Sequence, residues 1–337
     1  MGSDNAPAGE IEGIVAAAKT LNIRIVLVGR EPVLRPLLDK AGGSSMPVEI
    51  RNADEVVAMD EPPTAALRKK KNSSIRVAAD LVRNGEAVGL VSAGNTGAVM
   101  ATSKMVFGMV RGVDRPALAT VLPTLTGYSV MLDVGANVAC KPHHLVQFAV
   151  MGHLFSQKIV GIASPRVGLL SVGEEESKGN DLVKEVHQIL KHAHLNFIGN
   201  VEGRDIYNGR ADVIVCDGFT GNVALKTSEG LIEAMLSLMK EELTKNMKAR
   251  LGAALSRQAF RRLKKRLDYS EYGGAPLLGL RGASIICHGR SNGNAIKNAI
   301  RVAKDFAENH VAADMAVELA RIGADVWDVD DDNSMSA

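Results

Sequence analysis

The sequence predicts an α/β fold in which a mostly parallel sheet carries helices on both faces and one helical hairpin protrudes. Short apolar runs alternate with amphipathic stretches, and glycine and asparagine recur where one gives way to the other. This alternation is typical of strand–turn–helix units, whose strands pair in parallel. Hydrophobic residues make up 46% of the 337 residues, enough for a large core. We expect one two-lobed α/β domain over 1–327 and a disordered acidic tail at 328–337.

The first third of the chain opens with turn composition at 1–7 and then alternates helix and strand. The predicted elements are helices near 10–21, 31–40 and 73–83 and strands at 23–28, 48–50 and 87–91. Between them, 60–71 contains two prolines and the four cations from Arg68 to Lys71, and we expect a loop there. Those cations indicate either a solvated turn or a docking or phosphate-steering patch for an acidic partner.

The rest of the domain continues the same rhythm. Further strands are predicted at 117–121, 129–133, 167–172, 213–215 and 284–287, and helices at 181–192 and from about 293. Another helix is expected to start at Pro142, because proline is favourable in a first helical turn.

The stretch 211–226 is the one around which the fold is expected to be organised. Its strand stops at Asp217 and Gly218, and an amphipathic pattern follows Asn222. We expect a strand, a tight turn and a helix, with Lys226 about one turn inside that helix. Such a turn directs backbone N–H groups and the positive end of the helix dipole at one point, and a lysine adds a full charge. The stretch therefore predicts an anion-binding turn.

Five junctions share this pattern of apolar strand, glycine, asparagine and helix start. They lie at 92–97, 135–137, 178–180, 217–222 and 288–294. Turns at the carboxyl ends of strands line the ligand crevice in sheets of this kind, so we expect the five to meet there and hold an anion. Asparagine is also a common helix cap, which is the competing interpretation for each one. The candidate binding residues are Gly94, Asn95, Thr96, Gly97, Asn137, Lys178, Gly179, Asn180, Gly221, Asn222, Lys226 and Ser291.

Two long helical stretches without an intervening strand are predicted for 230–268. From 240 to 266 there are ten lysines or arginines against two glutamates, and Leu251, Leu255 and Phe260 belong to an apolar stripe beside them. A basic amphipathic hairpin is a candidate for contact with a membrane surface or with a partner's acidic face. A dimerisation arm whose charge is merely solvated is the alternative.

Overall composition points to a cytoplasmic globular enzyme. Forty basic and 38 acidic residues nearly balance, which gives no reason to expect nucleic acid as a partner. The longest apolar runs fall short of the ~20 residues that a membrane-spanning helix needs, and the N-terminus has no signal-peptide pattern. The three cysteines, Cys140, Cys216 and Cys287, form no CxxC pair, so we expect reduced thiols.

Templates for other chemistries fit poorly, and neither a metal nor a cofactor is expected. The sequence has no G-x-G-x-x-G or G-x-S-x-G motif, and three residues separate Asn222 from Lys226 where a P-loop lysine would follow its glycine directly. Cys140, His143 and His144 offer soft ligands, but adjacent histidines point in different directions on a helix. The acids at 174–176 are better explained by the helix dipole than by a divalent ion.

Seven segments spread over almost the whole chain carry a resemblance to a known family. They are SAGNTGA, RPALATVLPT, GANVACKPHHLVQFAVMG, GNVEGRD, VCDGFTGNVALKTSEG, DYSEYGGAPLLG and AIKNAI, in this order. They resemble those of bacterial phosphate acyltransferase, the acyl-ACP:phosphate transacylase of phospholipid synthesis. The resemblance implies that inorganic phosphate attacks the thioester of a long-chain acyl group on acyl carrier protein, giving acyl phosphate and free carrier. It also implies a fold similar to that of isocitrate and isopropylmalate dehydrogenases and of phosphotransacetylase, a homodimer, and peripheral contact with membrane lipid.

The resemblance gives the candidate residues their roles. Phosphate is already a nucleophile, so the enzyme has to orient it, screen its charge and stabilise an oxyanion. We expect Lys178 and Lys226 to meet phosphate or oxyanion charge, and the asparagines 95, 180 and 222 to position the reactants. His288 is a candidate proton donor to the departing thiol, and a turn residue hydrogen-bonded to the backbone is the alternative for it.

The sequence departs from the family pattern at three places. The family usually begins with a short apolar strand before a glycine-rich loop, whereas Met1 lies inside that loop and Ser3 replaces a glycine. Either that strand is lost or another segment fills its place. Ala139 stands where an acid is usual, and the turn at 290–294 is a variant of a serine-rich one.

Three other functions compete with this expectation. The first is a phosphotransacetylase-like enzyme that uses short acyl-CoA, with a smaller acyl pocket. The second is a membrane-bound scaffold for lipid-synthesis enzymes, in which the hairpin is the working part. A decarboxylating dehydrogenase of similar fold is disfavoured because the cofactor fingerprint is missing.

Overall fold

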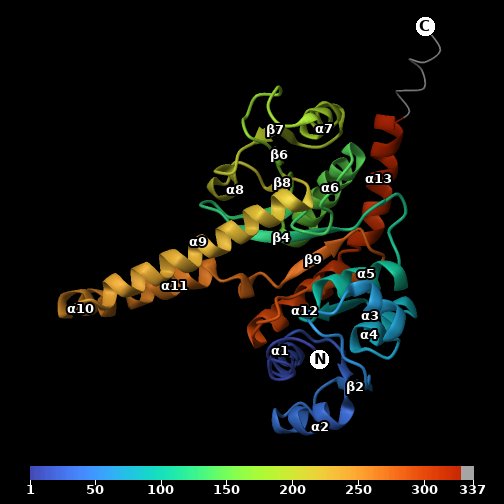
Figure 1. The fold of residues 1–337 in the computed structure, drawn as a ribbon, viewed down its shortest axis with the longest axis vertical. Helices are drawn as coiled ribbons and strands as arrows, with labels where there is room; N and C mark the ends of the chain where they lie inside the picture. The colour runs from blue at the N-terminus through green and yellow to red at the C-terminus, as the bar shows by residue number, and fades with distance from the viewer. Residues whose placement is uncertain (328–337) are drawn as a thin grey trace.

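The computed structural model describes residues 1–327, so the tail expected to be disordered lies outside the described residues. An eight-stranded sheet runs through the molecule in the order β3-β10-β9-β4-β5-β8-β6-β7, and β1 and β2 form a separate parallel pair near the N-terminus (Figure 1). The strands are β1 Ile25–Gly29, β2 Val48–Asn52, β3 Gly89–Ser92, β4 Ala117–Pro123, β5 Tyr128–Leu132, β6 Val167–Leu170, β7 Phe197–Val201, β8 Val213–Val215, β9 Ala275–Leu278 and β10 Ala283–Ile286.

The large sheet consists of two parallel groups joined by antiparallel strands. β3 pairs with β10 in parallel, and β5, β8, β6 and β7 pair in parallel with one another. Between the groups, β9 and β4 make antiparallel pairs. The short connections β4–β5 and β9–β10 explain this, because a parallel neighbour needs a crossover of a dozen or more residues. The predicted parallel α/β architecture is confirmed, whereas β7 and β9 were not expected from the sequence.

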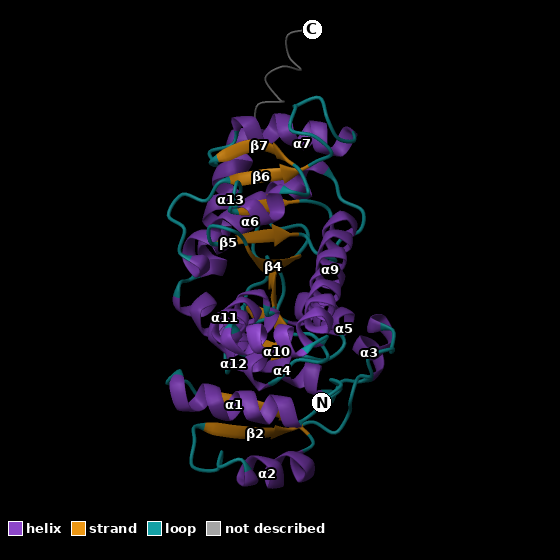
Figure 2. Ribbon diagram, turned by 90° about the vertical axis from the view of Figure 1, so that its left-hand side faces the viewer, coloured by secondary structure: helices purple, strands orange, loops and turns teal. Residues whose placement is uncertain are grey.

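Thirteen helices occur in the described residues. They are α1 Ala8–Thr20, α2 Glu31–Lys40, α3 Pro63–Lys69, α4 Ser74–Arg83, α5 Thr96–Val106, α6 Pro142–Phe155, α7 Asp181–His192, α8 Asp205–Asn208, α9 Gly218–Thr244, α10 Met247–Leu255, α11 Arg257–Leu267, α12 Gly293–Glu308 and α13 Val311–Trp327. A short π-helix follows α6 at Ser156–Val160, and a short 3-10 helix follows α11 at Tyr269–Glu271. Figure 2 shows α6 and α13 on one side of strands β4 to β7 and α9 on the other.

Two expectations about helix positions were wrong. The segment 60–71 is not a plain loop but contains α3, in which Pro63 takes the first helical position. Proline is favourable there because the first helical residues need no N–H for the helix itself. The helix after β8 begins at Gly218, ahead of Asn222, so Lys226 lies more than two turns inside α9.

The core is built around α6, which is apolar on nearly all sides. Its side chains Phe148, Met151 and Phe155 are buried at 1% exposure or less. A helix that is hydrophobic all round has to be enclosed by other elements. Here β8, α7 and α13 contact α6. These contacts hold α6 against the half of the sheet that contains β5 and β8.

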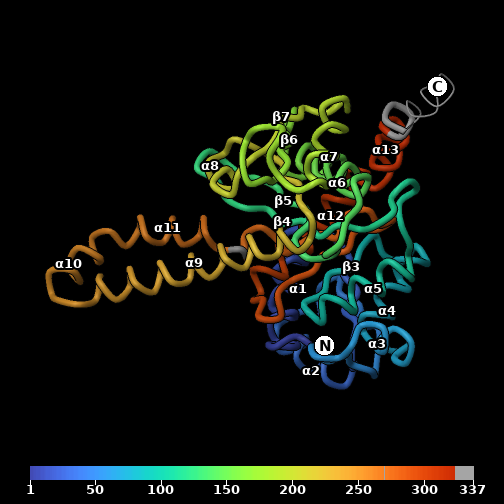
Figure 3. Tube along the Cα trace, turned by 45° about the horizontal axis from the view of Figure 1, so that its top comes forward, coloured from blue at the N-terminus to red at the C-terminus, as the bar shows by residue number. Residues whose placement is uncertain are grey.

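An arm leaves this body as a long helical projection. The 27-residue α9 starts in the core at β5, runs outward, and is followed by α10 at the tip and α11 on the way back (Figure 3). The predicted hairpin at 230–268 thus comprises the outer part of α9 and two further helices. Its large exposed apolar residues are Leu231, Met235, Leu238, Met247, Leu251, Leu255 and Leu263.

A cavity of about 600 Å³ separates β1 from β3. Each of these strands has a sheet neighbour on one side only, β2 and β10 respectively, and the other edge of each lines the cavity. Met1 lies at the same cavity, and burial lowers the pKa of its amino group. The N-terminal region therefore contains a slot bordered by two strand edges.

Candidate active site

Asp133, directly after β5, organises the turn that follows. It is fully buried, and its Oδ1 accepts hydrogen bonds from the N–H groups of Leu118, Gly135 and Ala136. Its Oδ2 accepts two from Asn137, 2.6 Å from the backbone nitrogen and 2.8 Å from Nδ2. Burial raises the pKa of Asp133, and the hydrogen bonds to its oxygens act in the opposite direction. The Asn137 amide is thereby used to shape the turn.

The first turn of α9 packs directly on that turn, which explains its two glycines. A Cβ at Gly218 would lie 2.7 Å from the Asn137 carbonyl oxygen, and one at Gly221 would lie 1.9 Å from the Asp133 carbonyl oxygen. Neither position leaves room for a side chain. The glycines at 218 and 221 therefore serve contact between helix and turn, and the side chain of Asn222 lies over Gly135.

Asp217 occupies the start of α9. Its Oδ1 accepts hydrogen bonds from the N–H groups of Phe219 and Thr220 at 3.0 and 2.9 Å, and its Oδ2 accepts one from the Thr220 hydroxyl. The donors expected to bind an anion at this turn are thus used by the protein's own carboxylate. An aspartate before a glycine at a helix start is a frequent cap, and this signal could have identified Asp217 from the sequence.

Lys226 lies on the exposed side of α9. Its Nζ is 2.7 Å from the Glu229 carboxylate one turn further along the helix. Six or seven residues, nearly two turns, separate it from the N–H donors of Phe219 and Thr220 at the helix start. The structure thus places Lys226 in an ion pair on the helix surface, apart from the Asp133–Asp217 region.

Two other turns meet across the loop at 58–61. The Nδ2 of Asn95 donates to the carbonyl oxygens of Ala58, Met59 and Glu61 at 2.9–3.0 Å, and its Oδ1 accepts the N–H of Ala98 in α5. On the other side of the same loop, the position of a Cβ at Gly289 is 3.2 Å from the Met59 methyl group. The β3–α5 and β10–α12 turns are therefore neighbours.

The β10–α12 turn carries His288 on its exposed surface. Its Nδ1 accepts the N–H of Arg290 at 3.1 Å, and its carbonyl oxygen accepts the N–H of Ser291 at 2.9 Å. These bonds agree with the alternative considered for His288 in the sequence, a turn residue that is hydrogen-bonded to the backbone. They also assign the ring proton of the neutral imidazole to Nε2, which makes that nitrogen a donor. Ser291, a candidate binding residue from the sequence, is buried.

The β6–α7 turn is tied to a different part of the protein. The Oδ1 of Asn180 caps α7 by accepting the N–H of Val183 at 2.9 Å. The Glu175 carbonyl oxygen in the same turn accepts a hydrogen bond from Asn200. Lys178 is exposed, and its stem lies against Gly173. The hydrogen bond from Asn200 connects this turn to β7. That the turn lies close to the other four stays a prediction.

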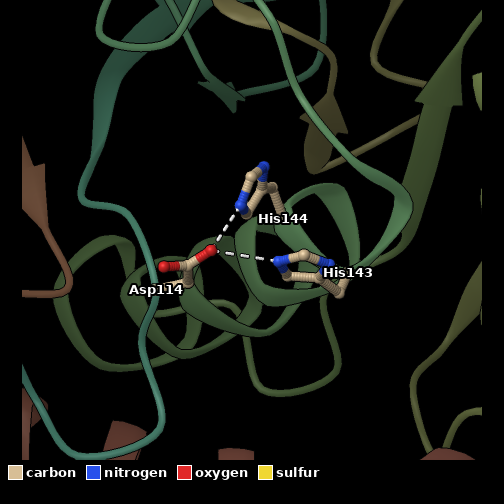
Figure 4. Close-up of side chains that lie close together, drawn as sticks. All are labelled: Asp114, His143 and His144. Carbon is tan, nitrogen blue, oxygen red and sulfur yellow. Dashed lines mark hydrogen bonds and ion pairs between the residues drawn. The ribbon is translucent and has the colours of Figure 1, made fainter.

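Asp114, His143 and His144 form the one three-residue cluster with metal-ligating spacing in the described part of the chain (Figure 4). The Nε2 atoms of His143 and His144 lie 3.1 and 2.6 Å from Asp114 Oδ2. Nδ1 of His144 accepts the N–H of Lys141 at 2.9 Å, which leaves the proton on Nε2. A protonated Nε2 donates to Asp114 and offers no lone pair to a metal, so we assign the cluster to a hydrogen-bond network.

The network ties the loop before β4 to the start of α6. Hydrogen bonds from the two histidines lower the pKa of Asp114 to about 2. Burial lowers the pKa of His144 and favours its neutral ring. Cys140, considered from the sequence as a ligand, has its pKa raised to about 11 by burial and remains a thiol.

Among the five predicted junctions, three helix starts combine open backbone donors with a neutral cap: those of α5, α7 and α12, capped by Asn95, Asn180 and Asn292. A neutral cap uses one or two N–H groups and adds no negative charge, so an anion is still attracted by the dipole. The start of α9 differs because Asp217 supplies a carboxylate. Of these three helix starts, those of α5 and α12 follow neighbouring strands, and their backbone donors can attract an anion without a nucleophile from the protein.

The fold is similar to that of solved phosphotransacetylases. A phosphotransacetylase from Streptococcus pyogenes superposes with a TM-score of 0.58 at 20% identity, covering 90% of this chain and 92% of its own. The EutD phosphotransacetylase from Staphylococcus aureus gives 0.57 at 18% identity, covering 89% and 92%. At these identities the likeness concerns the fold alone.

The sequence comparisons are far closer. The family model described as "Fatty acid synthesis protein" matches residues 1–314. The "Phosphate acyltransferase" of Acidobacterium capsulatum is 55% identical over 95% of both chains, and that of Heliobacterium modesticaldum is 55% identical over 93% of this chain and 94% of its own. The chain belongs to this family of phosphate acyltransferases, and acyl transfer to phosphate is its enzyme class.

Proposed function

We propose that this enzyme transfers the acyl group of long-chain acyl-[acyl carrier protein] to inorganic phosphate, giving acyl phosphate for phosphatidic acid synthesis. The names of its relatives support the acceptor, and the resemblance of its seven segments supports the donor. The structural observation in favour is the pair of neighbouring turns at 92–97 and 288–293, each opening a helix behind an asparagine cap. Both turns present backbone donors, and the second also carries the exposed cation Arg290.

In this proposal phosphate binds at the turn 92–97, where the N–H groups of Thr96 and Gly97 begin α5. The helix dipole and these donors hold the dianion, and Asn95 keeps the turn in shape through the loop at 58–61. A phosphate oxygen attacks the thioester carbon, the carbonyl oxygen becomes an oxyanion, and the thiolate leaves. His288 is placed on the adjacent turn, where its Nε2–H is proposed to donate a hydrogen bond that stabilises the departing thiolate, and the thiolate takes its proton from water.

The two lysines have unequal roles in this proposal. Lys178 precedes a helix start with a neutral cap and supplies charge to phosphate or to the oxyanion. Lys226 is held by Glu229, and Asn222 supports the turn at Gly135. We therefore expect Lys178→Ala to raise the KM for phosphate by about tenfold, corresponding to the loss of one charge-assisted contact. Lys226→Ala is the matched control, with less than about a twofold effect. An equal rise in KM in both variants would support the expectation from the sequence that both lysines meet phosphate or oxyanion charge.

One experiment decides between this activity and its rival. Acyl phosphate formation is measured with palmitoyl carrier protein and with acetyl-CoA, each with phosphate as acceptor. We expect turnover with the carrier-bound long chain and little with acetyl-CoA. A preference for acetyl-CoA would show a phosphotransacetylase-like enzyme instead.

We further propose a homodimer at the membrane surface in the cytoplasm. Among the described residues, no helix is both long and apolar enough to cross a bilayer. The exposed Leu251 and Leu255 in α10 support peripheral contact, and Leu231 and Met235 in α9 support a protein interface. Replacing both leucines of α10 by glutamate should abolish liposome binding while leaving the dimer, as measured by light scattering. Unchanged binding would remove the arm from membrane contact. The likeness to isocitrate and isopropylmalate dehydrogenases stays a prediction.

A further inference from the structure

Charge is unevenly divided between the two limbs of the arm. Within α9, from Lys226 outward, four glutamates stand against two lysines. From Met247 to Leu267 there are eight lysines or arginines and no acid. All eight of these side chains are exposed. The returning limb is therefore a strongly basic surface on a molecule whose net charge is only +2.

Six of the eight cations belong to α11, and they cover more than half of its circumference. They are Arg257, Arg261, Arg262, Lys264, Lys265 and Arg266. Phe260, Leu263 and Leu267 form the remaining apolar stripe. In the described part of the chain, Lys265 alone among the six approaches a carboxylate, that of Glu271 at 3.7 Å. Arg257, Arg261, Arg262 and Lys264 form no ion pair within the described residues, and these four cations are thus available to a partner.

The root of α11 is fixed in position. The Arg266 guanidinium donates to the carbonyl oxygens of Thr124 and Leu125 in the β4–β5 connection, the latter at 3.0 Å. The Tyr272 hydroxyl donates to the Arg266 carbonyl oxygen, and its ring meets Tyr128 edge to face at 5.6 Å between centroids. The basic face therefore has a defined orientation relative to the sheet.

A pocket of about 630 Å³ opens at this root. Its lining includes the four cations Arg262, Lys265, Arg266 and Arg301, one acid, Glu271, and apolar residues such as Phe155 and Ile159. A mainly basic lining with an apolar part complements an acidic surface from which one apolar side chain protrudes.

We propose that the basic face of α11, together with this pocket, is the docking surface for an acidic protein partner, the acyl carrier protein that delivers the acyl group. The inference rests on the proposed function for the identity of that partner. The observations favour a folded acidic partner over a lipid surface, because the basic residues flank a hollow at the root of the arm. A bilayer would meet the exposed apolar residues at the tip, Met247, Leu251 and Leu255.

The other basic run, Arg68 to Lys71, is the natural rival. There Lys70 is held by Glu61 at 2.5 Å and also donates to the Val56 carbonyl oxygen. Its three remaining cations lie on or beside the seven-residue α3. In comparison, α11 carries six exposed cations, of which Arg257, Arg261, Arg262 and Lys264 are available, so its electrostatic attraction for an acidic surface is stronger.

The test compares two triple charge reversals of equal size in the full-length enzyme. R261E/R262E/K264E changes the face of α11, and R68E/K69E/K71E changes the rival run. Binding of holo acyl carrier protein is measured by calorimetry at low and high salt. Phosphate acylation is measured with palmitoyl carrier protein and with a small palmitoyl thioester that lacks the protein.

We expect the α11 variant to raise the Kd and the KM for the carrier at least about tenfold, and its kcat to stay within about twofold. Its rate with the small thioester should equal that of the unmodified enzyme. The R68E/K69E/K71E variant should bind the carrier within about twofold of the unmodified enzyme. Added salt should weaken binding by the unmodified enzyme and have little effect on the α11 variant.

Other outcomes overturn the proposal. The first is unchanged carrier binding by the α11 variant, and the second is a loss of carrier binding in the R68E/K69E/K71E variant alone. The third comes from a parallel assay with anionic phosphatidylglycerol vesicles: the α11 variant loses vesicle binding but keeps carrier binding. The glutamine variant R261Q/R262Q/K264Q, which avoids new acids in α11, should show a smaller shift in the same direction, and thermal melting verifies its folding. If the unmodified enzyme binds the carrier but forms no acyl phosphate, the proposed function fails while the docking surface stands.

Discussion

Gly221 of α9 lies so close to Asp133 that a Cβ on the glycine would stand 1.9 Å from the aspartate carbonyl oxygen. We expect Gly221→Ala to push α9 off the β5 turn and to lower the free energy of unfolding by about 1–3 kcal/mol, the usual cost of overpacking. Gly230→Ala in the same helix is the control, because nothing lies within 4 Å of its added Cβ. It should stabilise by roughly 0.5–1 kcal/mol through helix propensity. Chemical denaturation measures both, and equal effects would contradict the packing argument.

Asp217 caps α9 with a carboxylate. Replacing it by alanine removes the acceptor for two N–H groups and should cost about 0.5–2 kcal/mol of stability. Asparagine keeps the acceptor, so Asp217→Asn should unfold within about 0.5 kcal/mol of the unmodified protein. Thermal melts of the three proteins at pH 7 distinguish these cases. A large loss in the asparagine variant would mean that the charge itself holds the helix start.

The Asp114–His144 pair predicts how stability depends on acid. The folded pKa of Asp114, about 2, lies below its ordinary value of 3.8, so its contribution is complete above pH 4 and is lost as the pH falls toward 2. Burial lowers the pKa of His144, so the unfolded chain binds a proton more readily, and the free energy of unfolding falls as the pH drops below 6.5. The melting temperature of Asp114→Asn should therefore fall less between pH 4 and pH 2 than that of the unmodified protein. Parallel curves in that range would exclude the network.

The slot between β1 and β3 predicts that an added strand is stabilising. A six-residue extension rich in valine and isoleucine before Met1 should pair with both strand edges and raise the melting temperature. It also moves the charged amino group away from its buried place. A glycine–serine extension of equal length is the control and should give no rise. If the apolar extension behaves like the control, the slot does not accept a strand.

Local signals explain the parts of the fold that the sequence predicted well. The helices Glu31–Lys40 and Asp181–His192 match their predicted ranges because each is amphipathic and has clear end signals, such as Asn180 before α7. The helix in 60–71 was missed because its prolines indicated a turn, although Pro63 fits the first position of α3. Strands β7 and β9 are short and carry glycine or proline, so their pairing depends on neighbours distant in the sequence.

The site was less predictable than the fold, for a physical reason. An asparagine at a helix start has the same sequence signature whether its amide serves a ligand or its own helix. The structure shows that Asn95, Asn180 and Asn292 each accept an N–H from the helix that follows. The contact of α9 with the Asp133 turn depends on the neighbouring places of β5 and β8 in the sheet, which no local pattern encodes. Its two glycines resembled a phosphate-binding turn and serve close packing instead.

The uninterrupted length of α9 has a mechanical consequence. At 1.5 Å per residue its 27 residues form a rod about 40 Å long, with one end locked on the Asp133 turn and the other at the tip of the arm. Because the helix is continuous from the sheet to the tip, the close packing of Gly218 and Gly221 sets the direction in which the whole arm projects.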